Sequence, residues 1–151
     1  MPVTALTDGE SDHSHPMFLP DGKHFIYSRV SSRAGTSGIY VGSIDAKADQ
    51  QSRKILLNDL YAMFAPGETP DRGYLIFERQ ATLMAQPFDA GKLELSGEAQ
   101  PLADLLTVYI RRGLFTVSKN GTLGLQHGNC RHVGTGLAGS PGAGPSFRRS
   151  G

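Results

Sequence analysis

Residues 18–27 read Phe-Leu-Pro-Asp-Gly-Lys-His-Phe-Ile-Tyr, so the pair Asp21-Gly22 stands between two short apolar segments. Asp-Gly pairs are frequent in the tight turns of β-hairpins, because residues in these turns must tolerate a positive φ. The apolar segments on either side read as the two strands that such a turn connects. This stretch therefore predicts a β-hairpin, and nineteen glycines and nine prolines favour a turn-rich, all-β chain.

The strand-turn-strand layout occurs three times, at residues 15–28, 62–78 and 113–126. The turn pairs Asp21-Gly22 and Asn120-Gly121 are 99 residues apart, and Leu19-Pro20 and Ala65-Pro66 are 46 apart, so the first spacing is about two of the second. A blade of a WD-type β-propeller takes about 40–45 residues. The spacing therefore fits propeller blades with slightly long loops.

Further apolar segments complete each period. In the first period, residues 38–45 read as a third strand and residues 53–57 as a fourth. In the second period, residues 82–89 read as the third strand, and the fourth is either 93–95 or 100–103. Pro87 has no N–H to donate to a neighbouring strand, so it is expected at a strand end, an edge or a bulge.

Four short antiparallel strands per repeat describe a propeller blade. The sequence thus predicts an all-β fold, a partial β-propeller of about two and a half four-stranded antiparallel blades. The expected parts are an outer strand of a preceding blade at 3–7, blades at 15–58 and 61–104, a half blade at 113–128 and a tail at 129–151. Because propellers have about 4–8 blades, residues 1–128 are expected to form an incomplete propeller. Further blades or self-association are expected to complete it.

The tail at 129–151 differs in composition from the rest of the chain. It contains six glycines, three arginines and no acidic residue, and Phe147 is its one aromatic residue. No alternation or helical period runs through it, and its apolar content is too low to offset the entropy of ordering. We expect this tail to be disordered, either as a genuine linker or as out-of-frame translation, which translating the other two frames would decide.

Charge and composition bear on partners and location. Residues 1–104 carry 9 basic and 14 acidic residues, whereas residues 105–151 carry 6 basic residues and none that is acidic. These six charges are scattered and interleave with no aromatic patch, so no nucleic-acid binding is expected. Cys130 is the single cysteine, which excludes an internal disulfide. No signal peptide or membrane-spanning segment is recognised, and the localisation stays open.

Residues 18–27 resemble the repeat signature of TolB-type (WD-like, PD40-type) propellers, whose hairpins carry Ser-Pro-Asp-Gly-Lys before an apolar strand. The stretches 38–43, 74–77, 83–89 and 115–121 are similar to one bacterial subgroup of these repeats. In that subgroup the propeller often forms the C-terminal, sensor-like half of a serine/threonine protein kinase. The resemblance covers about residues 3–127 and implies a propeller, but no ligand. From Asn129 onward, the aromatic strand and Asp-Arg-x-Gly turn of the subgroup are missing.

Motifs of catalysis and nucleotide binding are weak in this chain. Phe88-Asp89-Ala90-Gly91 only superficially resembles a kinase Asp-Phe-Gly, and no other kinase motif occurs. Gly134–Gly139 matches G-x-G-x-x-G, but no acidic residue follows it within the chain. Gly136 to Ser140 is not a G-x-S-x-G nucleophile elbow. The sequence therefore predicts no catalytic residue and no cofactor.

A small cluster of potential metal ligands lies before the first turn. Alternation along a strand would place His13 and His15 on one face. Glu10 and Asp12 are the nearest candidates for the third ligand that a catalytic zinc needs. Packing near a sheet edge explains these residues better, so no metal site is predicted. The strand aromatics are likewise expected to pack between blades rather than to bind a ligand: Phe18, Phe25, Tyr27, Tyr40, Phe64, Tyr74, Phe77 and Phe88.

These observations leave three hypotheses for function. The chain is a non-catalytic interaction or sensor module, an accessory propeller of a prolyl-oligopeptidase-type serine peptidase, or a gene remnant without a selected function. A kinase and a membrane helix encoded upstream would favour the first, and a G-x-S-x-G domain encoded downstream the second. Expression data would separate the third. The protein or small ligand that it binds cannot be read from the sequence.

Overall fold

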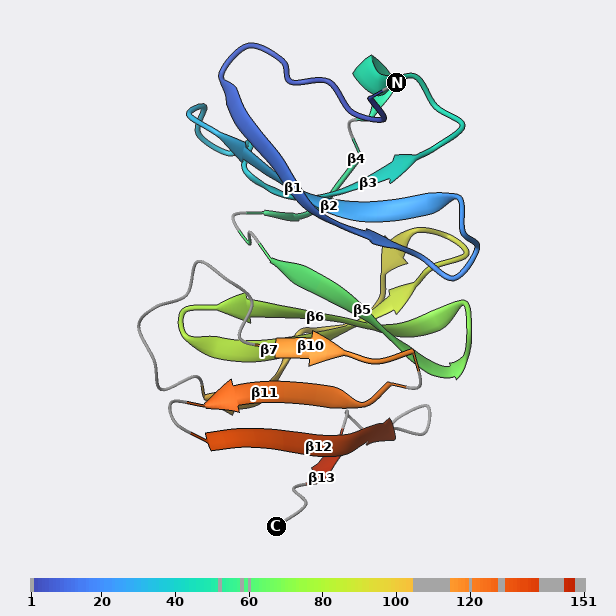
Figure 1. Ribbon diagram of the computed structural model, residues 1–151, viewed down its shortest axis with the longest axis vertical. Coiled ribbons are helices and arrows are strands. Elements are labelled where there is room, and N and C mark those ends of the chain that lie inside the picture. Colours follow the sequence, from blue (N-terminus) through green and yellow to red (C-terminus); the bar gives the residue numbers. More distant parts are fainter. Residues whose placement is uncertain are drawn as a thin grey trace. The chain divides into compact units, whose positions relative to one another are not determined.

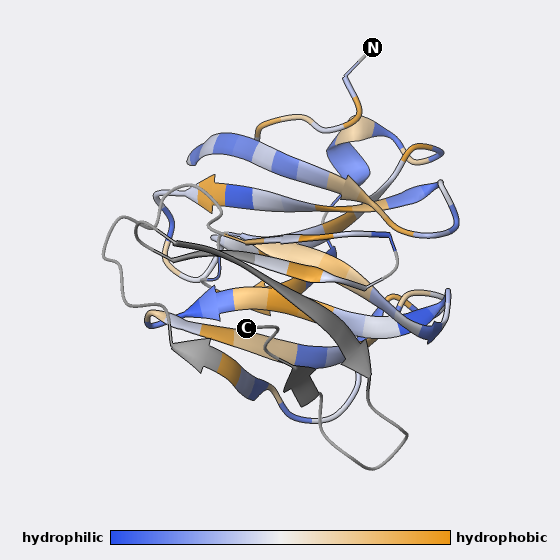
Figure 2. Cartoon of the chain, turned by 60° about the horizontal axis from the view of Figure 1, so that its bottom comes forward, coloured by the Kyte–Doolittle hydropathy of each residue, from blue (hydrophilic) through white to orange (hydrophobic). Residues whose placement is uncertain are grey.

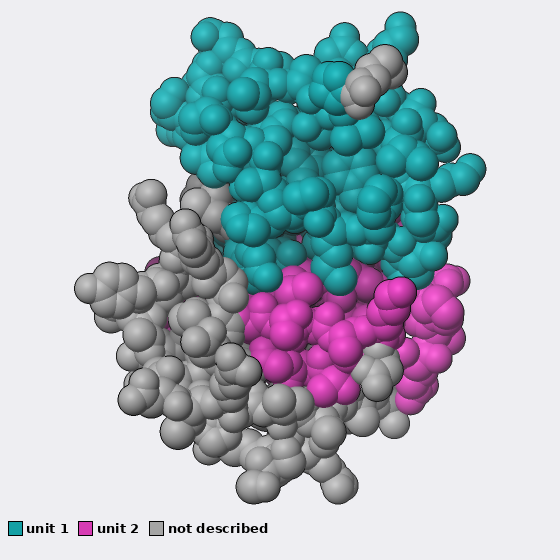
Figure 3. Space-filling model, in the orientation of Figure 1, with its two compact units in different colours: residues 1–62 teal, residues 63–151 magenta. Residues whose placement is uncertain are grey.

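The computed structural model describes residues 2–51, 53–57, 59, 61–104, 115–119, 121–127, 130–138 and 146–148. The described residues form antiparallel strands and one short 3-10 helix, η1 (Ala48–Gln50), so the predicted all-β fold is confirmed (Figure 1). The chain divides into two compact units, residues 1–62 and 63–151 (Figure 3).

The first unit contains one four-stranded antiparallel sheet. Its strands are β1 (Glu10–Phe18), β2 (His24–Ser31), β3 (Gly38–Ser43) and β4 (Arg53–Leu57), and they lie side by side in chain order. The strands expected at 38–45 and 53–57 are confirmed. The first strand starts at Glu10, earlier than the expected blade boundary at 15, because residues 10–14 also pair with β2.

The two faces of this sheet differ in chemistry. In the register, Tyr27 lies opposite Tyr40, Phe25 opposite Gly42 and Arg29 opposite Gly38. Directly opposite residues share a face, so aromatic rings and one arginine gather on the face defined here as the aromatic face: Phe25, Tyr27, Arg29 and Tyr40. The other face is aliphatic and buried, with Ile26, Ile39, Val41 and Leu56 each at most 5% exposed. Figure 2 shows hydrophobic and hydrophilic bands along the strands.

The Asp21-Gly22 turn joins β1 to β2 as the sequence predicts. Gly22 has a φ of 67°, and its N–H donates to the carbonyl of Leu19 at 3.0 Å. The Asp21 carboxylate accepts from the N–H groups of Lys23 (3.0 Å) and His24 (2.9 Å). Burial alone would raise the pKa of Asp21, but these bonds and the His24 ring lower it to about 2. The carboxylate therefore stays ionised and holds the turn in all but strongly acidic solution.

The second unit begins with a five-stranded antiparallel sheet. Its strands are β5 (Ala62–Thr69), β6 (Arg72–Arg79), β7 (Thr82–Asp89), β8 (Glu94–Leu95) and β9 (Gln100–Asp104). Both β8 and β9 pair with β7, so the two candidates for the fourth strand both occur and the expected four-stranded blade is wrong in its strand count. The break between them lies beside Pro87, whose carbonyl accepts from Ser96 N–H. Pro87 has no N–H to donate, and the fourth strand is interrupted beside it.

Gly73 permits the close pairing of β5 and β6. A Cβ at this position would collide with the carbonyl oxygen of Ala65 in β5 and would come within 2.9 Å of the Phe64 ring. We expect Gly73→Ala to lower the free energy of unfolding by about 1–3 kcal/mol, since backbone must move to admit the methyl group. Gly91→Ala is the control, because its nearest atom would lie at an ordinary 3.4 Å. Urea unfolding followed by circular dichroism measures both, and equal losses would contradict the prediction.

A third sheet follows in the second unit. Its strands are β10 (Phe115–Val117), β11 (Leu123–His127), β12 (Cys130–Ala138) and β13 (Ser146–Arg148), side by side in chain order. The expected hairpin of β10 and β11 is confirmed, and Gly121 has the positive φ of 78° that its turn needs. Asn120 lies outside the described residues.

Two sequence expectations about the chain ends are wrong. Residues 130–138 pair with β11, and residues 146–148 pair with β12, so both form strands rather than disordered tail. Backbone pairing does not require the apolar side chains whose scarcity suggested disorder. Residues 3–7 form no strand. Instead, Ala5 N–H donates to the Ala48 carbonyl at 3.2 Å, which attaches the segment to the η1 loop of its own unit.

Candidate functional site

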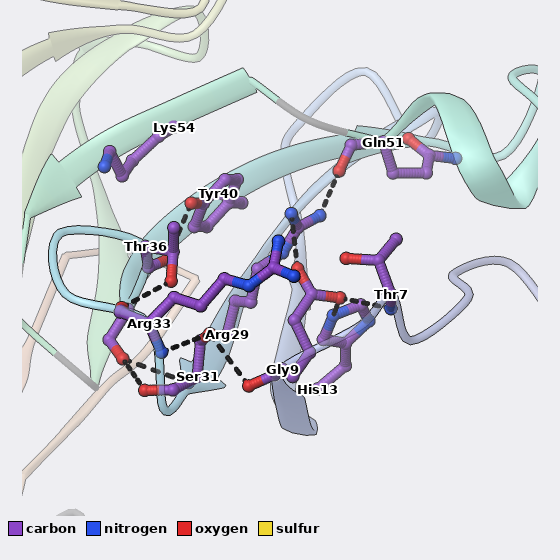
Figure 4. Close-up of polar contacts among 12 residues, drawn as sticks. Thr7, Gly9, His13, Arg29, Ser31, Arg33, Thr36, Tyr40, Gln51 and Lys54 are labelled. Atoms are coloured by element: carbon purple, nitrogen blue, oxygen red, sulfur yellow. Dashed lines mark hydrogen bonds and ion pairs between the residues drawn. The ribbon is translucent and has the colours of Figure 1, made fainter.

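A buried cluster of charged side chains lies on the aromatic face of the first unit (Figure 4). It forms because the register of β1 and β2 places His13 opposite Arg29 and Glu10 opposite Ser31. Ser31 is the next residue after Arg29 on the same face of β2. The strand register thus brings a carboxylate, an imidazole and a guanidinium together. Their side chains are 5%, 8% and 12% exposed, so the three groups interact in a largely dry environment.

Both carboxylate oxygens of Glu10 have partners. Oε1 lies 2.9 Å from Arg29 Nη1, and Oε2 lies 3.2 Å from His13 Nε2 and accepts from Thr7 N–H at 2.7 Å. Burial by itself would raise the pKa of Glu10, but the Thr7 hydrogen bonds and the charges of Arg29 and His13 outweigh it and lower the pKa below 4.5. Glu10 is therefore an ionised carboxylate held by three groups.

Arg29 connects this carboxylate to the aromatic rings. Its Nη2 donates to the Tyr27 hydroxyl at 2.7 Å and also to the Gln51 carbonyl. Its guanidinium lies 4.0 Å from the centroid of the Tyr40 ring, a cation–π contact. Burial of Tyr27 raises the pKa of its phenol, although the neighbouring guanidinium opposes this. The Tyr27 hydroxyl therefore stays neutral and donates to Gln51 at 2.7 Å.

Gln51 covers the aromatic face from the loop after η1. It is 4% exposed, and its amide binds both backbone groups of Ser43, accepting from N–H at 2.8 Å and donating to the carbonyl at 2.6 Å. Its Nε2 also donates to the Val3 carbonyl at 3.1 Å. A Cβ at Gly42 would come within 2.9 Å of Gln51 Oε1 and 2.5 Å of the Phe25 ring, so only glycine leaves room for both.

The cluster is not fully satisfied. Two buried atoms, His13 Nδ1 and Arg29 Nε, have no hydrogen-bond partner among the residues that the structure describes. Unpaired polar atoms in a low-dielectric interior cost stability, so the network stabilises the unit less than a complete one would. Because both Glu10 oxygens are already engaged, the arrangement holds chain segments together rather than presenting a free base.

His13 and His15 do not share a site, so that expectation is wrong. A register shift between Ser14 and Met17 adds a residue to β1, and His15 takes a positive φ of 52° within it. This bulge breaks the alternation on which the expectation depended. His13 turns toward Glu10 and Tyr27, whereas the His15 ring contacts the Tyr61 ring at 5.1 Å.

The described side chains contain no group of three or more His, Cys, Asp or Glu residues that could hold a metal ion. Asp12 is exposed, and Glu10 is committed to its ion pair. Residues 134–138 of the G-x-G-x-x-G match lie within β12, and not in the strand-to-helix turn that a phosphate site needs. Asp89 ends β7 and accepts from Lys92 N–H at 2.9 Å as a turn residue.

The eight strand aromatics lie on strands as expected. Most are part of the core, and the buried ones are Phe25, Tyr27, Tyr40, Phe64, Phe77 and Phe88, each at most 5% exposed. Tyr74 is half-buried, and Phe18 is 58% exposed.

Arg29 and Gln51 were missed by sequence reasoning. The signal for Arg29 was its place two residues after Tyr27, where alternation puts a cation on a core face; Gln51 has no such local signal.

Comparison of the chain with protein-family models, with curated proteins and with solved structures found no match. Among the described residues, no helix has the length and apolar character needed to cross a membrane. The geometry of the site itself therefore has to support any functional proposal.

Proposed function

We propose that this chain is a non-catalytic β-propeller segment of the TolB-like type that acts as an interaction or sensor module of a larger protein. The observation that carries the proposal is the repetition of antiparallel sheets in which four strands follow chain order, β1 to β4, β5 to β8 (with β9 also paired with β7) and β10 to β13. Successive four-stranded meanders are the building unit of propellers. The matching glycine turns at Gly22 and Gly121 support equivalent positions in two repeats.

The absence of catalysis is part of the proposal. The carboxylate and imidazole that come together, Glu10 and His13, are buried and engaged with each other, Arg29 and Thr7. A general base needs access to a substrate proton, and these side chains are only 5% and 8% exposed. The cluster holds chain segments of the first unit together, and binding is expected at a propeller face.

Purified chain is expected to self-associate. Strands β1 and β4 are the outer strands of the first sheet, and several large apolar side chains are 46–58% exposed: Val3, Leu6, Phe18, Ile44 and Leu57. Open edges and apolar surface favour pairing between chains. Leu57→Lys places a charge on β4 and should reduce the associated fraction severalfold in sedimentation velocity. Gln50→Lys, outside the strands, is the control, and a monomeric wild-type chain that unfolds cooperatively would contradict the prediction.

The coding sequence on both sides of this chain tests the function itself. The proposal expects further repeats at a spacing of about 40–50 residues, with a kinase and a membrane helix upstream. A downstream G-x-S-x-G domain would instead indicate an accessory propeller of a serine peptidase. Flanking sequence without such repeats would overturn the propeller proposal.

A further inference from the structure

The N-terminal segment of the first unit, residues 2–9, is attached to the rest of the unit by a few polar contacts. Gln51 Nε2 donates to the Val3 carbonyl, Ala5 N–H donates to the Ala48 carbonyl, and Thr7 N–H donates to Glu10. At its end, the Gly9 carbonyl accepts from Ser31 and Ser32. We call this segment the strap. Its apolar side chains Val3 and Leu6 are 46% and 56% exposed, so apolar burial contributes little to holding it.

Glu10 is the point on which these contacts converge. It binds Thr7 of the strap directly, and through the ion pair with Arg29 it orients the guanidinium that donates to the Gln51 carbonyl. Gln51 in turn holds Val3. One carboxylate is therefore linked directly to Thr7 and, through Arg29 and Gln51, to Val3. Figure 4 shows Thr7, Arg29 and Gln51.

We propose that residues 2–9 are a strap that the ionised Glu10 holds closed over Gln51, the residue that covers the aromatic face. Neutralising Glu10 opens the strap while the sheet stays folded. The proposal concerns the first unit alone and does not depend on a propeller. The incomplete hydrogen bonding of the cluster supports it, because a partly satisfied network separates at lower cost than a complete one.

Acid is the natural condition that neutralises Glu10. The folded-state pKa of Glu10 is lowered below its unfolded value of about 4.5. The contacts of the ionised carboxylate therefore stabilise the closed strap fully above pH 4.5, and this stabilisation is lost as the pH falls through the folded-state pKa. The ionisable side chains on the same face or on the segments that pack against it are His13, Tyr27, Arg29, Tyr40 and Lys54. Asp8, Asp45, Lys47 and Asp49 on the strap and the loop are exposed.

Amide hydrogen exchange of Glu10→Gln tests the proposal at neutral pH. Glutamine keeps the shape and one acceptor oxygen but removes the charge. Exchange at Ala5 and Thr7 should rise at least about tenfold, while exchange at the paired Tyr27 and Tyr40 amides should stay within about twofold. Asp8→Asn is the matched control, because the Asp8 carboxylate is 92% exposed and pairs with Arg33 on the surface. It should leave strap exchange unchanged.

Two results would overturn the proposal. One is strap exchange in Glu10→Gln equal to that of the wild-type chain. The other is equal increases at the strap and at Tyr27 and Tyr40, which would make Glu10 a general support of the sheet. Should Glu10→Gln not fold, the wild-type chain titrated with acid from pH 7 until strap or sheet protection is lost gives the same decision after correction for intrinsic exchange. Loss of exchange protection in the strap before loss in the sheet supports the proposal, and simultaneous loss in both overturns it.

Discussion

Replacing Arg29 with methionine is expected to lower the free energy of unfolding of the first unit by about 3–5 kcal/mol. Methionine fills much of the same space but leaves the Glu10 carboxylate buried beside a neutral side chain. The Tyr40 ring also loses its cation, and the Gln51 carbonyl loses a donor. A buried charge without its partner is among the most costly single changes in a protein interior. Urea unfolding followed by far-ultraviolet circular dichroism measures the loss.

Arg33→Met is the matched control for this change. Arg33 pairs with Asp8, but its side chain is 61% exposed and that of Asp8 is 92% exposed, so the pair should be worth at most about 1 kcal/mol. The double variant Arg29→Met with Glu10→Gln should recover part of the loss, because no unpaired charge then remains. A double variant that loses the full sum of the two single losses would show that Glu10 and Arg29 act independently.

Replacing Phe25 with alanine is expected to cost about 3–5 kcal/mol. Its ring is 4% exposed and belongs to the core cluster with Tyr27 and Tyr40. Removing it leaves a cavity above Gly42, which has no side chain of its own to fill the space. The loss is therefore both of buried apolar area and of packing contacts.

Phe18→Ala provides a control with the same chemistry. Phe18 lies directly opposite Phe25 in the register, with 6.0 Å between the ring centroids, but it is 58% exposed. Its removal should cost less than about 1.5 kcal/mol, which is the range of an aromatic pair at a partly exposed site. Losses of similar size for the two variants would contradict the difference in burial between the two rings.

Much of the strand layout could be predicted because its causes are local. The Asp21-Gly22 pair placed the first turn, and period-two apolar segments placed β3, β4 and β7 at or within a few residues of their observed bounds. The fourth strand of the second unit was ambiguous between two segments because both are apolar enough to pair. The structure resolves this by pairing both with β7, on either side of the break beside Pro87.

The candidate site could be predicted only in part. His13 and His15 were recognised as a cluster with Glu10 or Asp12, but the grouping assumed an unbroken strand. The bulge at His15 sends that ring to Tyr61 and leaves His13 with Glu10. Nothing in the neighbouring residues indicates a bulge at this position, because it depends on how β1 pairs with β2.

The sequence alone determined the all-β class, the position of the turns and most of the strands, because turn chemistry and side-chain alternation act over a few residues. The tertiary structure decided which side chains meet. The pairing of Glu10 with Arg29 and the attachment of Val3 to Gln51 join residues 19 and 48 positions apart. Such contacts depend on strand register, and register is set by the sheet as a whole rather than by the residues that it brings together.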